Sequence, residues 1–342
     1  MYGAAVAARN TAYDRGWLRQ ATLPCRVVSV GNLTVGGTGK TACTQLIAER
    51  FQRMGRTVVI LSRGYGGAQH AYTLRVEAGR LLVDGQEAPR DGLADEPQLL
   101  AQALPEVPVL VGAKRAATGA EACQRFQTDT AILDDGLQHR QLRRDCEIIL
   151  VHARMPLGGW AMFPRGPMRE PLSSLKRADI IVVTKADEAL ELAGAIGERL
   201  QSLAPEAVLA MAVHQPSAVR EALTGQRHEP KLLQGRRVAL LSSIGDPQGF
   251  EATVRRLHAD VAWHHTFPDH HRFLPSDWQA ITARMRGQRL DALVTTDKDW
   301  VRLQPAASQA PPAAPLWVLE VRMALLSGEQ AFNDRLARVH AG

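Results

Sequence analysis

Three residues at the end of the segment VSVGNLTVGGTGKT (28–41) have the types and spacing of a phosphate-binding loop: Gly39, Lys40 and Thr41. The usual pattern G-x-x-x-x-G-K-[ST] has glycine at its first position, where this sequence has Thr34. Glycines let backbone N–H groups turn toward a phosphate, the lysine reaches the terminal phosphates, and the hydroxyl coordinates Mg²⁺. The loop follows a predicted strand and precedes a predicted helix, which is the context that a phosphate loop requires. We therefore predict a nucleotide site with threonine at the first loop position.

A pair of carboxylates in TAILDDGLQHR supports this interpretation. Asp134 and Asp135 end an apolar run that reads as a strand. A carboxylate at the carboxyl end of a parallel strand can hold Mg²⁺ opposite a phosphate loop. Asp-Asp-Gly is also an ordinary turn sequence. Together with the phosphate loop, the pair predicts a site for a nucleotide with Mg²⁺.

The segment VVTKADE leaves an alternative open. Thr184, Lys185 and Asp187 resemble the N/T-K-x-D element with which GTPases select guanine. With the histidines described next, this would fit a P-loop GTPase or metal-insertion factor. The same residues are also compatible with a strand followed by an aspartate that caps a helix, which is the commoner arrangement.

Four histidines gather in HHTFPDHH, namely His264, His265, His270 and His271. Adjacent histidines on a strand point to opposite faces, and no further Cys/His group completes a metal-binding set. We therefore favour a single catalytic or phosphate-contacting histidine beside Asp269 over a metal site.

Composition narrows the class of protein. The 342 residues are 45% hydrophobic and 22% charged, which is typical of a folded chain, and the length suggests two domains. The four cysteines have no C-x-x-C spacing and read as reduced thiols. The net charge is +6, and arginine makes up most of the 41 basic residues, which suits phosphates or anionic lipid and also fits a compositional bias of the genome. Aromatic residues, at 5%, are too few for stacking on nucleic acid.

Apolar β-branched runs alternate with helical stretches along the first part of the chain. Strands are predicted at 26–30, 57–62, 107–112, 130–134, 147–152 and 179–184, with helices at 40–54 and 95–104. Near-continuous apolar strands are typical of a sheet covered on both faces. We predict an α/β fold, a P-loop NTPase-like doubly wound parallel sheet, with an exposed β-hairpin at 71–85 that turns at Ala78-Gly79.

A second, smaller α/β domain is expected towards the C-terminus. The predicted boundaries are a P-loop domain at 1–215, a polar linker at 216–235 and the smaller domain at 236–342. Its strands are expected at 238–245, 260–267, 291–297 and 316–322, with a Pro/Ala loop at 304–315.

The motifs together resemble one family. VGNLTVGGTGKT, LSRGYGG, ADEPQLLA, LDDGLQHRQLRRD, PRGPMREPLSSLKRAD, FPDHHRF and TTDKDWVRL occur in this order between about residues 26 and 303. They closely resemble the tetraacyldisaccharide 4′-kinase (lipid A 4′-kinase) family, which carries threonine at the first loop position. One departure is Ala42, where the family usually has proline.

The resemblance implies a lipid kinase. ATP with Mg²⁺ would phosphorylate the 4′-hydroxyl of a tetraacylated glucosamine disaccharide 1-phosphate, at the cytoplasmic face of the bacterial inner membrane. Attachment would be peripheral, with residues 1–24 as a membrane-interface segment: Tyr2, Val6, Trp17 and Leu18 with Arg9, Arg15 and Arg19 would form a short interfacial helix. No nucleic-acid partner is expected.

The resemblance also implies roles for individual residues. Asp95 matches the general base, His270 the histidine that pairs with it, and Lys40 completes the catalytic set. The residues that would bind ATP are Thr34, Val35, Gly36, Gly37, Thr38, Gly39, Lys40 and Thr41. The metal ligands would be Thr41, Asp134, Asp135 and Glu170. The contacts with phosphate or substrate would be Arg63, Arg115, His139 and Arg169. From the residues alone, Asp95 also reads as a helix N-cap, and Arg63 and Arg115 as solvated surface charges.

Overall fold

The computed structural model describes residues 2–65, 70–77, 80–87, 92–154, 161–308, 310, 312 and 314–341. The chain divides into two compact units. Unit 1 comprises Met1–His214 and Met323–Gly342, and unit 2 comprises Gln215–Arg322. The chain passes from unit 1 to unit 2 within one long strand and returns within another.

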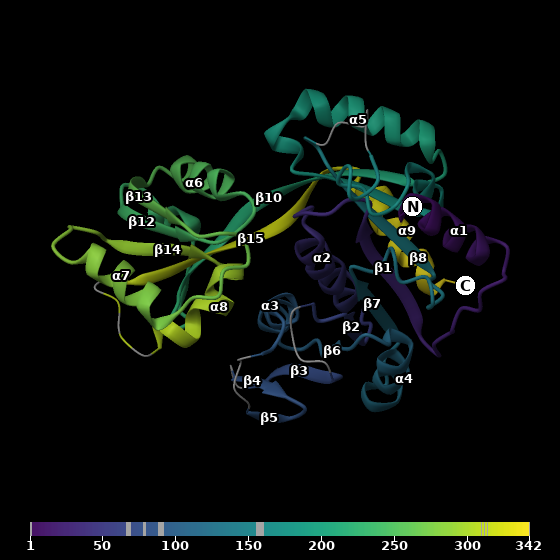
Figure 1. Ribbon diagram of the computed structural model, residues 1–342, viewed down its shortest axis with the longest axis horizontal. Helices are drawn as coiled ribbons and strands as arrows, with labels where there is room; N and C mark the ends of the chain where they lie inside the picture. The colour runs from purple at the N-terminus through teal and green to yellow at the C-terminus, as the bar shows by residue number, and fades with distance from the viewer. Residues whose placement is uncertain are drawn as a thin grey trace. The chain divides into compact units, whose positions relative to one another are not determined.

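Unit 1 is built on a mostly parallel sheet (Figure 1). In spatial order its strands are β10 (Val208–Glu221), β9 (Ile180–Thr184), β8 (Cys146–His152), β1 (Arg26–Asn32), β7 (Thr130–Asp134), β2 (Val58–Ser62), β6 (Val109–Val111), β3 (Tyr72–Glu77), β4 (Arg80–Val83) and β5 (Gln86–Glu87). The strands from β10 to β6 pair in parallel, and β3, β4 and β5 continue the sheet antiparallel. The β3–β4 pair is the predicted hairpin, whose turn at Ala78-Gly79 lies outside the described residues.

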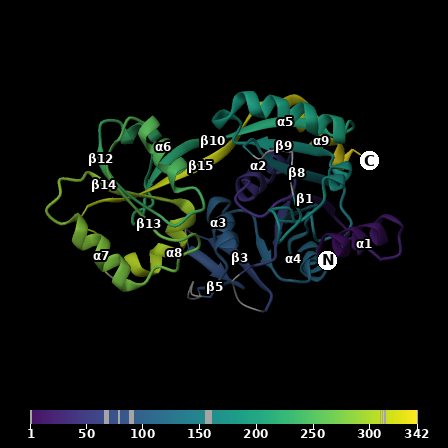
Figure 2. The same cartoon turned by 45° about the horizontal axis from the view of Figure 1, so that its top comes forward.

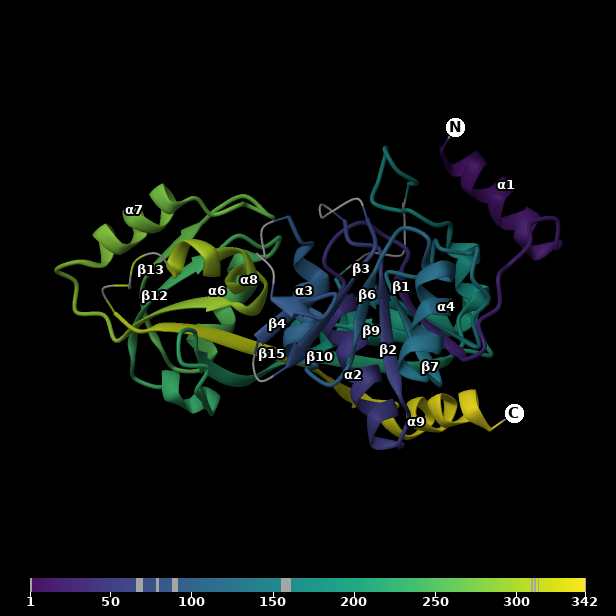
Figure 3. The same cartoon turned by 90° about the horizontal axis from the view of Figure 1, so that it is seen from below.

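Helices cover both faces of this sheet because its central strands are apolar on both sides. Val28 and Val30 of β1 pack into one core cluster and Val27 into another. The first cluster is covered by α2 (Lys40–Arg53), α3 (Asp95–Ala103) and α9 (Glu329–Ala337), and the opposite face by α4 (Arg115–Phe126) and α5 (Leu190–Leu203). Figure 3 shows α9 beside α2, where Phe51 meets His340 edge to face. The α/β fold with its doubly wound sheet is therefore confirmed.

The remaining elements of unit 1 are helical, and the 3₁₀ turns among them add Leu175, Ala186 and Val339 to the core clusters. They are α1 (Tyr2–Asp14) and the 3₁₀ turns η1 (Leu172–Arg177), η2 (Ala186–Glu188) and η4 (Arg338–His340). Among the described residues, the structure contains no helix with the length and apolarity needed to cross a bilayer.

The strands of unit 2 pair in parallel in the order β13 (Asp260–Thr266), β12 (Arg237–Ser242), β14 (Ala292–Thr296) and β15 (Leu316–Ser327), and β15 is followed in the same sheet by β10. Its helices are α6 (Pro247–Arg256), α7 (Pro275–Met285) and α8 (Asp297–Ala307), with η3 (Pro230–Leu233) and the short strand β11 (Arg227–His228), which pairs with β10. Trp278 and Trp300 fill the core on one face, and Phe250 and Val254 fill the other.

Three boundaries differ from the sequence-based expectation. Residues 216–221 continue strand β10, and 227–233 form β11 and η3, so the segment 216–235 is structured within unit 2 and is not a linker. Its polar residues alternate with buried ones such as Val219, a pattern that a search for continuous apolar strands passes over. Residues 323–342 belong to unit 1, because Phe332 and Leu336 of α9 pack into its core. Helix α8 extends to Ala307, into the predicted Pro/Ala loop.

Candidate active site

The phosphate loop lies between β1 and α2, where its glycines are used at two positions. Gly36 and Gly39 have φ of +103° and +83°, in the left-handed region that favours glycine. A Cβ at Gly39 would also lie 2.7 Å from Nε2 of His214. Gly39 is the N-cap of α2, so the first N–H groups of that helix point into the loop without a side-chain cap, an arrangement that favours anions.

Thr34 occupies a position that does not need glycine. Its φ is outside the left-handed region, and it forms a bridge with Met168 on a neighbouring segment. The N–H of Val35 donates to the carbonyl of Pro167 at 2.8 Å. The loop therefore enters as an extended segment paired with residues 167–168, which explains why threonine is accommodated there.

Lys40 lies beside an amide and a carboxylate near this loop. Its Nζ donates to Oδ1 of Asn32 at 3.3 Å and lies 3.7 Å from Oδ1 of Asp135. Arg169 grips Asp135 through both oxygens, at 2.7 and 2.9 Å, and also donates to Asn32. Strands β1 and β7 are adjacent and parallel, so Asn32 and Asp135 lie at the same edge of the sheet. Figure 2 shows β1, β8 and β9 following one another in this sheet.

Asp134 and Asp135 are held differently although they are neighbours. Asp134 is 2% exposed, and its oxygens accept from Thr44 at 3.3 Å and Ser62 at 3.4 Å. Burial, with the negative charges of Glu96 and Asp135, raises the pKa of Asp134 to about 7. Burial acts on Asp135 in the same sense, but the hydrogen bonds from Arg169 and the charge of Lys40 outweigh it and lower the pKa of Asp135. Asp135 is therefore the ionised partner of the cations.

The predicted phosphate contacts lie around the same carboxylates. Arg115, at the start of α4, is 2% exposed and donates to the carbonyl of Asp135 at 3.1 Å. Burial and the charge of nearby arginines, Arg115 first, lower the pKa of His139 to about 4, so its imidazole is neutral at pH 7. Arg63 is exposed and lies over the ring of Tyr65, whose hydroxyl it contacts at 2.7 Å. Arg115 is therefore a buried charge, and the surface interpretation applies to Arg63.

The site fits a polyphosphate with a hard divalent cation. Several of its buried polar atoms have no hydrogen-bond partner among the described residues: Asn32 Nδ2, Thr38 Oγ1, Arg115 Nε, His139 Nε2 and Arg169 Nε. All but one of these are donors in any protonation state, and the imidazole can act as a donor or an acceptor. Asp134 and Thr41 offer a carboxylate and a hydroxyl oxygen, with Asp135 beside them, and Mg²⁺ in nucleotide sites commonly uses one or two carboxylates with substrate phosphates.

Glu170, which the family resemblance gave as a metal ligand, is held by side chains of other residues. Its carboxylate is 0% exposed and accepts from Arg9 at 2.6 Å, Asn10 at 2.7 Å and Ser174 at 2.9 Å. A carboxylate that already has three donors is part of a buried ion-pair network. Its role as a metal ligand stays a prediction, whereas its contacts with Arg9 and Asn10 of α1 were not expected from the sequence.

Asp95 and His270 belong to different units, and each has its own setting. Asp95 is the first residue of α3, whose N-cap is Ala94, so Asp95 is not the N-cap that the alternative interpretation required. His270 lies in a turn after β13 with φ of +60°, and not on a strand. Its N–H donates to Oδ1 of Asp269 at 3.0 Å, and its Nε2 lies 3.4 Å from Nζ of Lys298.

The other histidines of the cluster have structural partners. His271 pairs with Asp277 at 2.9 Å and stacks on Phe267, with centroids 4.3 Å apart. His264 contacts Ser242 at 2.8 Å and Glu251 at 3.1 Å. Among the described residues, no group of three or more His, Cys, Asp or Glu side chains is arranged to hold a metal ion.

Sequence reasoning missed four polar residues that the fold brings to the nucleotide site: Asn32, Thr44, Ser62 and His214. Asn32 and Ser62 each end an otherwise apolar strand, a signal that could have identified them. His214 ends the unit 1 part of β10, a strand that the sequence did not suggest.

A phosphate loop at the carboxyl edge of a parallel sheet, facing a buried carboxylate and three cations, defines a P-loop phosphotransferase. The family model described as tetraacyldisaccharide-1-P 4′-kinase matches residues 1–341. The chain belongs to this family, as the motifs suggested, and is a kinase that acts on a hydroxyl group.

Individual relatives agree over most of their length. The chain is 40% identical to the tetraacyldisaccharide 4′-kinase of Anaeromyxobacter dehalogenans strain 2CP-C, over 98% of this chain and 87% of the relative. It is 38% identical to that of Syntrophus aciditrophicus, over 91% and 84%. A crystal structure of LpxK from Aquifex aeolicus in complex with ATP is similar over 99% of this chain and 96% of that one, with a TM-score of 0.77 and 27% identity.

Proposed function

We propose that this protein transfers the γ-phosphate of ATP to the 4′-hydroxyl of a tetraacylated glucosamine disaccharide 1-phosphate. The observation that carries the proposal is the convergence of Lys40, Asp135 and Arg169 beside the phosphate loop. Phosphoryl transfer depends on positioning and on cations that stabilise charge spread over the transferred group. Lys40, Arg169 and Arg115 supply such cations, and His139 supplies a neutral hydrogen-bonding group.

Mg²⁺ fits the oxygens of Thr41 and Asp134, with Asp135 beside them. When bound, it neutralises charge on the phosphates and orients them. The hydrogen bonds that Asp134 accepts from Thr44 and Ser62 are long, at 3.3 and 3.4 Å, and therefore weak. Exchanging them for contacts with a cation would cost little hydrogen-bond energy. Asp135 is already satisfied by Arg169, which gives it the role of holding that arginine and Lys40 in place.

Asp95 acts as the general base that accepts the proton of the 4′-hydroxyl, and His270 is the second catalytic group. Support comes from the motifs ADEP and FPDHHRF and from the two settings described above. Asp95 starts a helix without being its N-cap, and the side chain of His270 is 58% exposed, so neither residue is buried in a structural role. A positioned base contributes roughly 10²- to 10⁴-fold to such a reaction.

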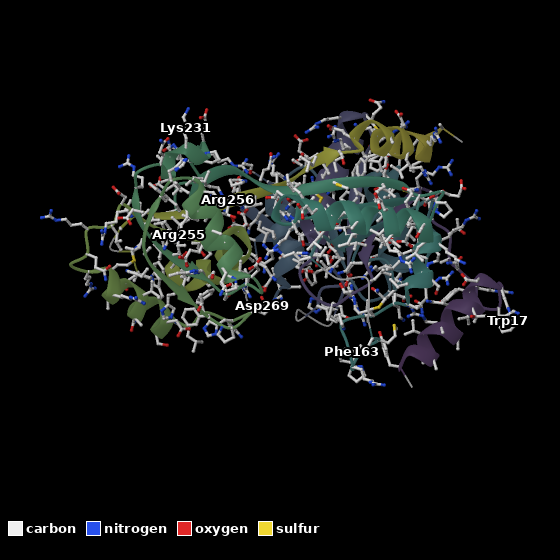
Figure 4. The ribbon with its side chains drawn as sticks, turned by 90° about the horizontal axis from the view of Figure 1, so that it is seen from above. Trp17, Phe163, Lys231, Arg255, Arg256 and Asp269 are labelled. Atoms are coloured by element: carbon white, nitrogen blue, oxygen red, sulfur yellow. The ribbon has the colours of Figure 1, made fainter. Side chains whose placement is uncertain are left out.

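The lipid substrate calls for contact with a membrane surface, which we assign to the two ends of α1. Tyr2 and Phe163 meet edge to face with centroids 5.9 Å apart, and both are exposed. Trp17 is 68% exposed and follows the other end of the helix, and Figure 4 shows Phe163 and Trp17 near opposite ends of α1. Aromatic rings of this kind suit a bilayer interface. The attachment is peripheral, at the cytoplasmic face of the inner membrane.

The predicted interfacial helix needs one revision. Val6 is buried, and Arg9 pairs with Glu170, so the middle of α1 packs on the protein while its ends are exposed.

The test is transfer of ³²P from γ-labelled ATP to the disaccharide lipid in detergent micelles, with the product mapped by mass spectrometry. We expect one added phosphate on the 4′ position, dependent on ATP and Mg²⁺. Hydrolysis of GTP without a phosphorylated lipid would favour the GTPase alternative and overturn the proposal.

A further inference from the structure

The buried carboxylate of Glu170 joins the N-terminal helix to the nucleotide side of unit 1. Arg9 Nη2 donates to Oε1 at 2.6 Å, and Asn10 Nδ2 donates to Oε2 at 2.7 Å. Arg177 lies 3.7 Å from Oε2. The carboxylate is fully buried, and a buried charge is tolerated when it is paired and hydrogen-bonded. Helix α1 therefore supplies half of the pairing that Glu170 requires.

The backbone around Glu170 is hydrogen-bonded to the start of the phosphate loop. The N–H groups of Arg169 and Glu170 both donate to the carbonyl of Leu33, at 2.7 and 3.1 Å. Val35 donates back to Pro167 at 2.8 Å. Residues 167–170, which we call the bridging segment, thus run beside the loop that enters α2. A shift of the bridging segment would move the loop with it.

The same segment carries Arg169, which holds Asp135 through two hydrogen bonds. A second contact from α1 reaches this residue, because the hydroxyl of Tyr2 donates to the carbonyl of Arg169 at 3.3 Å. The far end of the helix is fixed independently, since Arg140 donates to the carbonyl of Asn10 at 2.9 Å and to Asp14 at 2.7 Å. The position of α1 and the position of Arg169 are therefore tied together through the side chain of Glu170 and the hydroxyl of Tyr2.

We propose that Glu170 is a positioning residue through which α1 holds the bridging segment, and with it Arg169 and the phosphate loop, in the arrangement that binds ATP. Docking of α1 is then a requirement for the nucleotide site, and the helix whose ends we assign to the membrane also supports the phosphate loop. The membrane part rests on the proposed function. The link between α1 and ATP binding does not, because it can be measured without lipid.

The experiment measures the affinity of a fluorescent ATP analogue without lipid, first in EDTA and then with Mg²⁺, for the wild type, Arg9→Ala, Glu170→Gln and the double variant. Arg9 is partly exposed, so Arg9→Ala is expected to fold even if Glu170→Gln does not. Arg199→Ala, an exposed arginine on α5, removes the same charge from unit 1 at a site away from the bridging segment. Arg9→Lys keeps the charge, and a thermal melt of each variant reports its folding.

We expect Arg9→Ala and Glu170→Gln each to weaken binding roughly 10-fold, because small displacements of a positioned site have effects of 10- to 100-fold. The double variant should be no weaker than the worse single, Arg9→Lys should recover most of the affinity, and Arg199→Ala should match the wild type. A loss confined to Glu170→Gln and seen solely with Mg²⁺ would make Glu170 a metal ligand and overturn the proposal. So would additive effects of the two changes, or wild-type affinity in Arg9→Ala. Failure of the proposed function would appear elsewhere, as an absence of lipid phosphorylation by the wild type.

Discussion

The nucleotide side of unit 1 and the His270 turn of unit 2 hold their polar groups in contrasting ways. In unit 1, Asp134 and Arg115 are each 2% exposed; Asp134 accepts from Thr44 and Ser62, and Arg115 donates to the carbonyl of Asp135. In the turn, the side chains of His270 and Asp269 are 58% and 44% exposed and lie 3.9 Å apart. The side chains of the nucleotide site in unit 1 are therefore held in place without a ligand. In the His270 turn the backbone is held in place, but the side chains are exposed.

The backbone of that turn is held by a buried network within unit 2. Asp299 accepts from the N–H and hydroxyl of Ser243, and the carbonyl of Ser243 accepts from the N–H of His270. The difference matches the two tasks. Stabilising several phosphate charges requires cations placed in advance in a low-dielectric site. A side chain that assists proton transfer must come within hydrogen-bond distance of the substrate, and its hydrogen bonds commonly shorten when the substrate is bound.

The largest expected effect comes from removing the loop lysine. Lys40→Ala should lower phosphoryl transfer by roughly 10³-fold or more, because the cation on the transferred phosphates is lost. Thr34→Gly is the control and should change the rate little, since the backbone there has no need of glycine. Steady-state transfer assays measure both. Near-normal turnover of Lys40→Ala would remove the basis of the nucleotide site.

The next effect concerns the base. Asp95→Ala should lower kcat by roughly 10²- to 10⁴-fold, with the KM for lipid changed much less. His270→Ala should be similarly damaging, and the double variant little worse than either, if the two residues act as a unit. Kinetics at saturating ATP decide this. Full kcat in Asp95→Ala would move the base to Asp134, Asp135 or Asp269.

His271→Ala is the matched control for His270, and its expected defect is one of stability. The ring of His271 is bonded to Asp277 and stacked on Phe267. Its loss should lower the thermal midpoint while kcat at low temperature stays close to that of the wild type. The reverse result, a stable protein with a damaged kcat, would mean that the two histidines have exchanged roles.

A smaller effect concerns pH and His214. Burial, with the positive charge of Lys185, lowers the pKa of His214 to about 4, whereas an unfolded histidine titrates near 6.5. The unfolded state then binds the extra proton between these values, so this residue makes stability fall as pH drops from about 6.5 to about 4. Urea unfolding at pH 7 and 5 should show a smaller acid loss in His214→Gln. An equal loss in both proteins would contradict the assignment.

The smallest effect is expected at the element that resembles a guanine reader. Asp187 is exposed, within the 3₁₀ turn η2 that follows β9. Asp187→Asn should change kcat with ATP by no more than about 2-fold, as surface substitutions usually do. Competition between ATP and GTP gives the base preference. A strong GTP preference that Asp187→Asn relaxes would contradict the ATP assignment.

The sequence was most informative where one strand or loop determines a residue's position. The strands of unit 1 are continuous apolar runs; Gly39 and Lys40 start the helix after one of them, and Asp134 and Asp135 lie at the end of another, so pattern alone placed them. It was least informative for side-chain direction and for long-range pairing. Glu170 turns toward α1, because Arg9 and Asn10, some 160 residues earlier, neutralise it. Residues 323–342 return to unit 1 for the same kind of reason, since α9 completes a core that no local pattern reveals.

The most direct test of the division of tasks combines two measurements on His270→Ala and Lys40→Ala: calorimetric affinity for an ATP analogue and the single-turnover rate of transfer to the lipid. We predict that His270→Ala binds the nucleotide like the wild type and transfers phosphate roughly 100-fold more slowly. Lys40→Ala should lose both binding and transfer. If His270→Ala lost nucleotide affinity, or transferred phosphate at the wild-type rate, the separation between a preformed phosphate site and an exposed catalytic histidine would be contradicted.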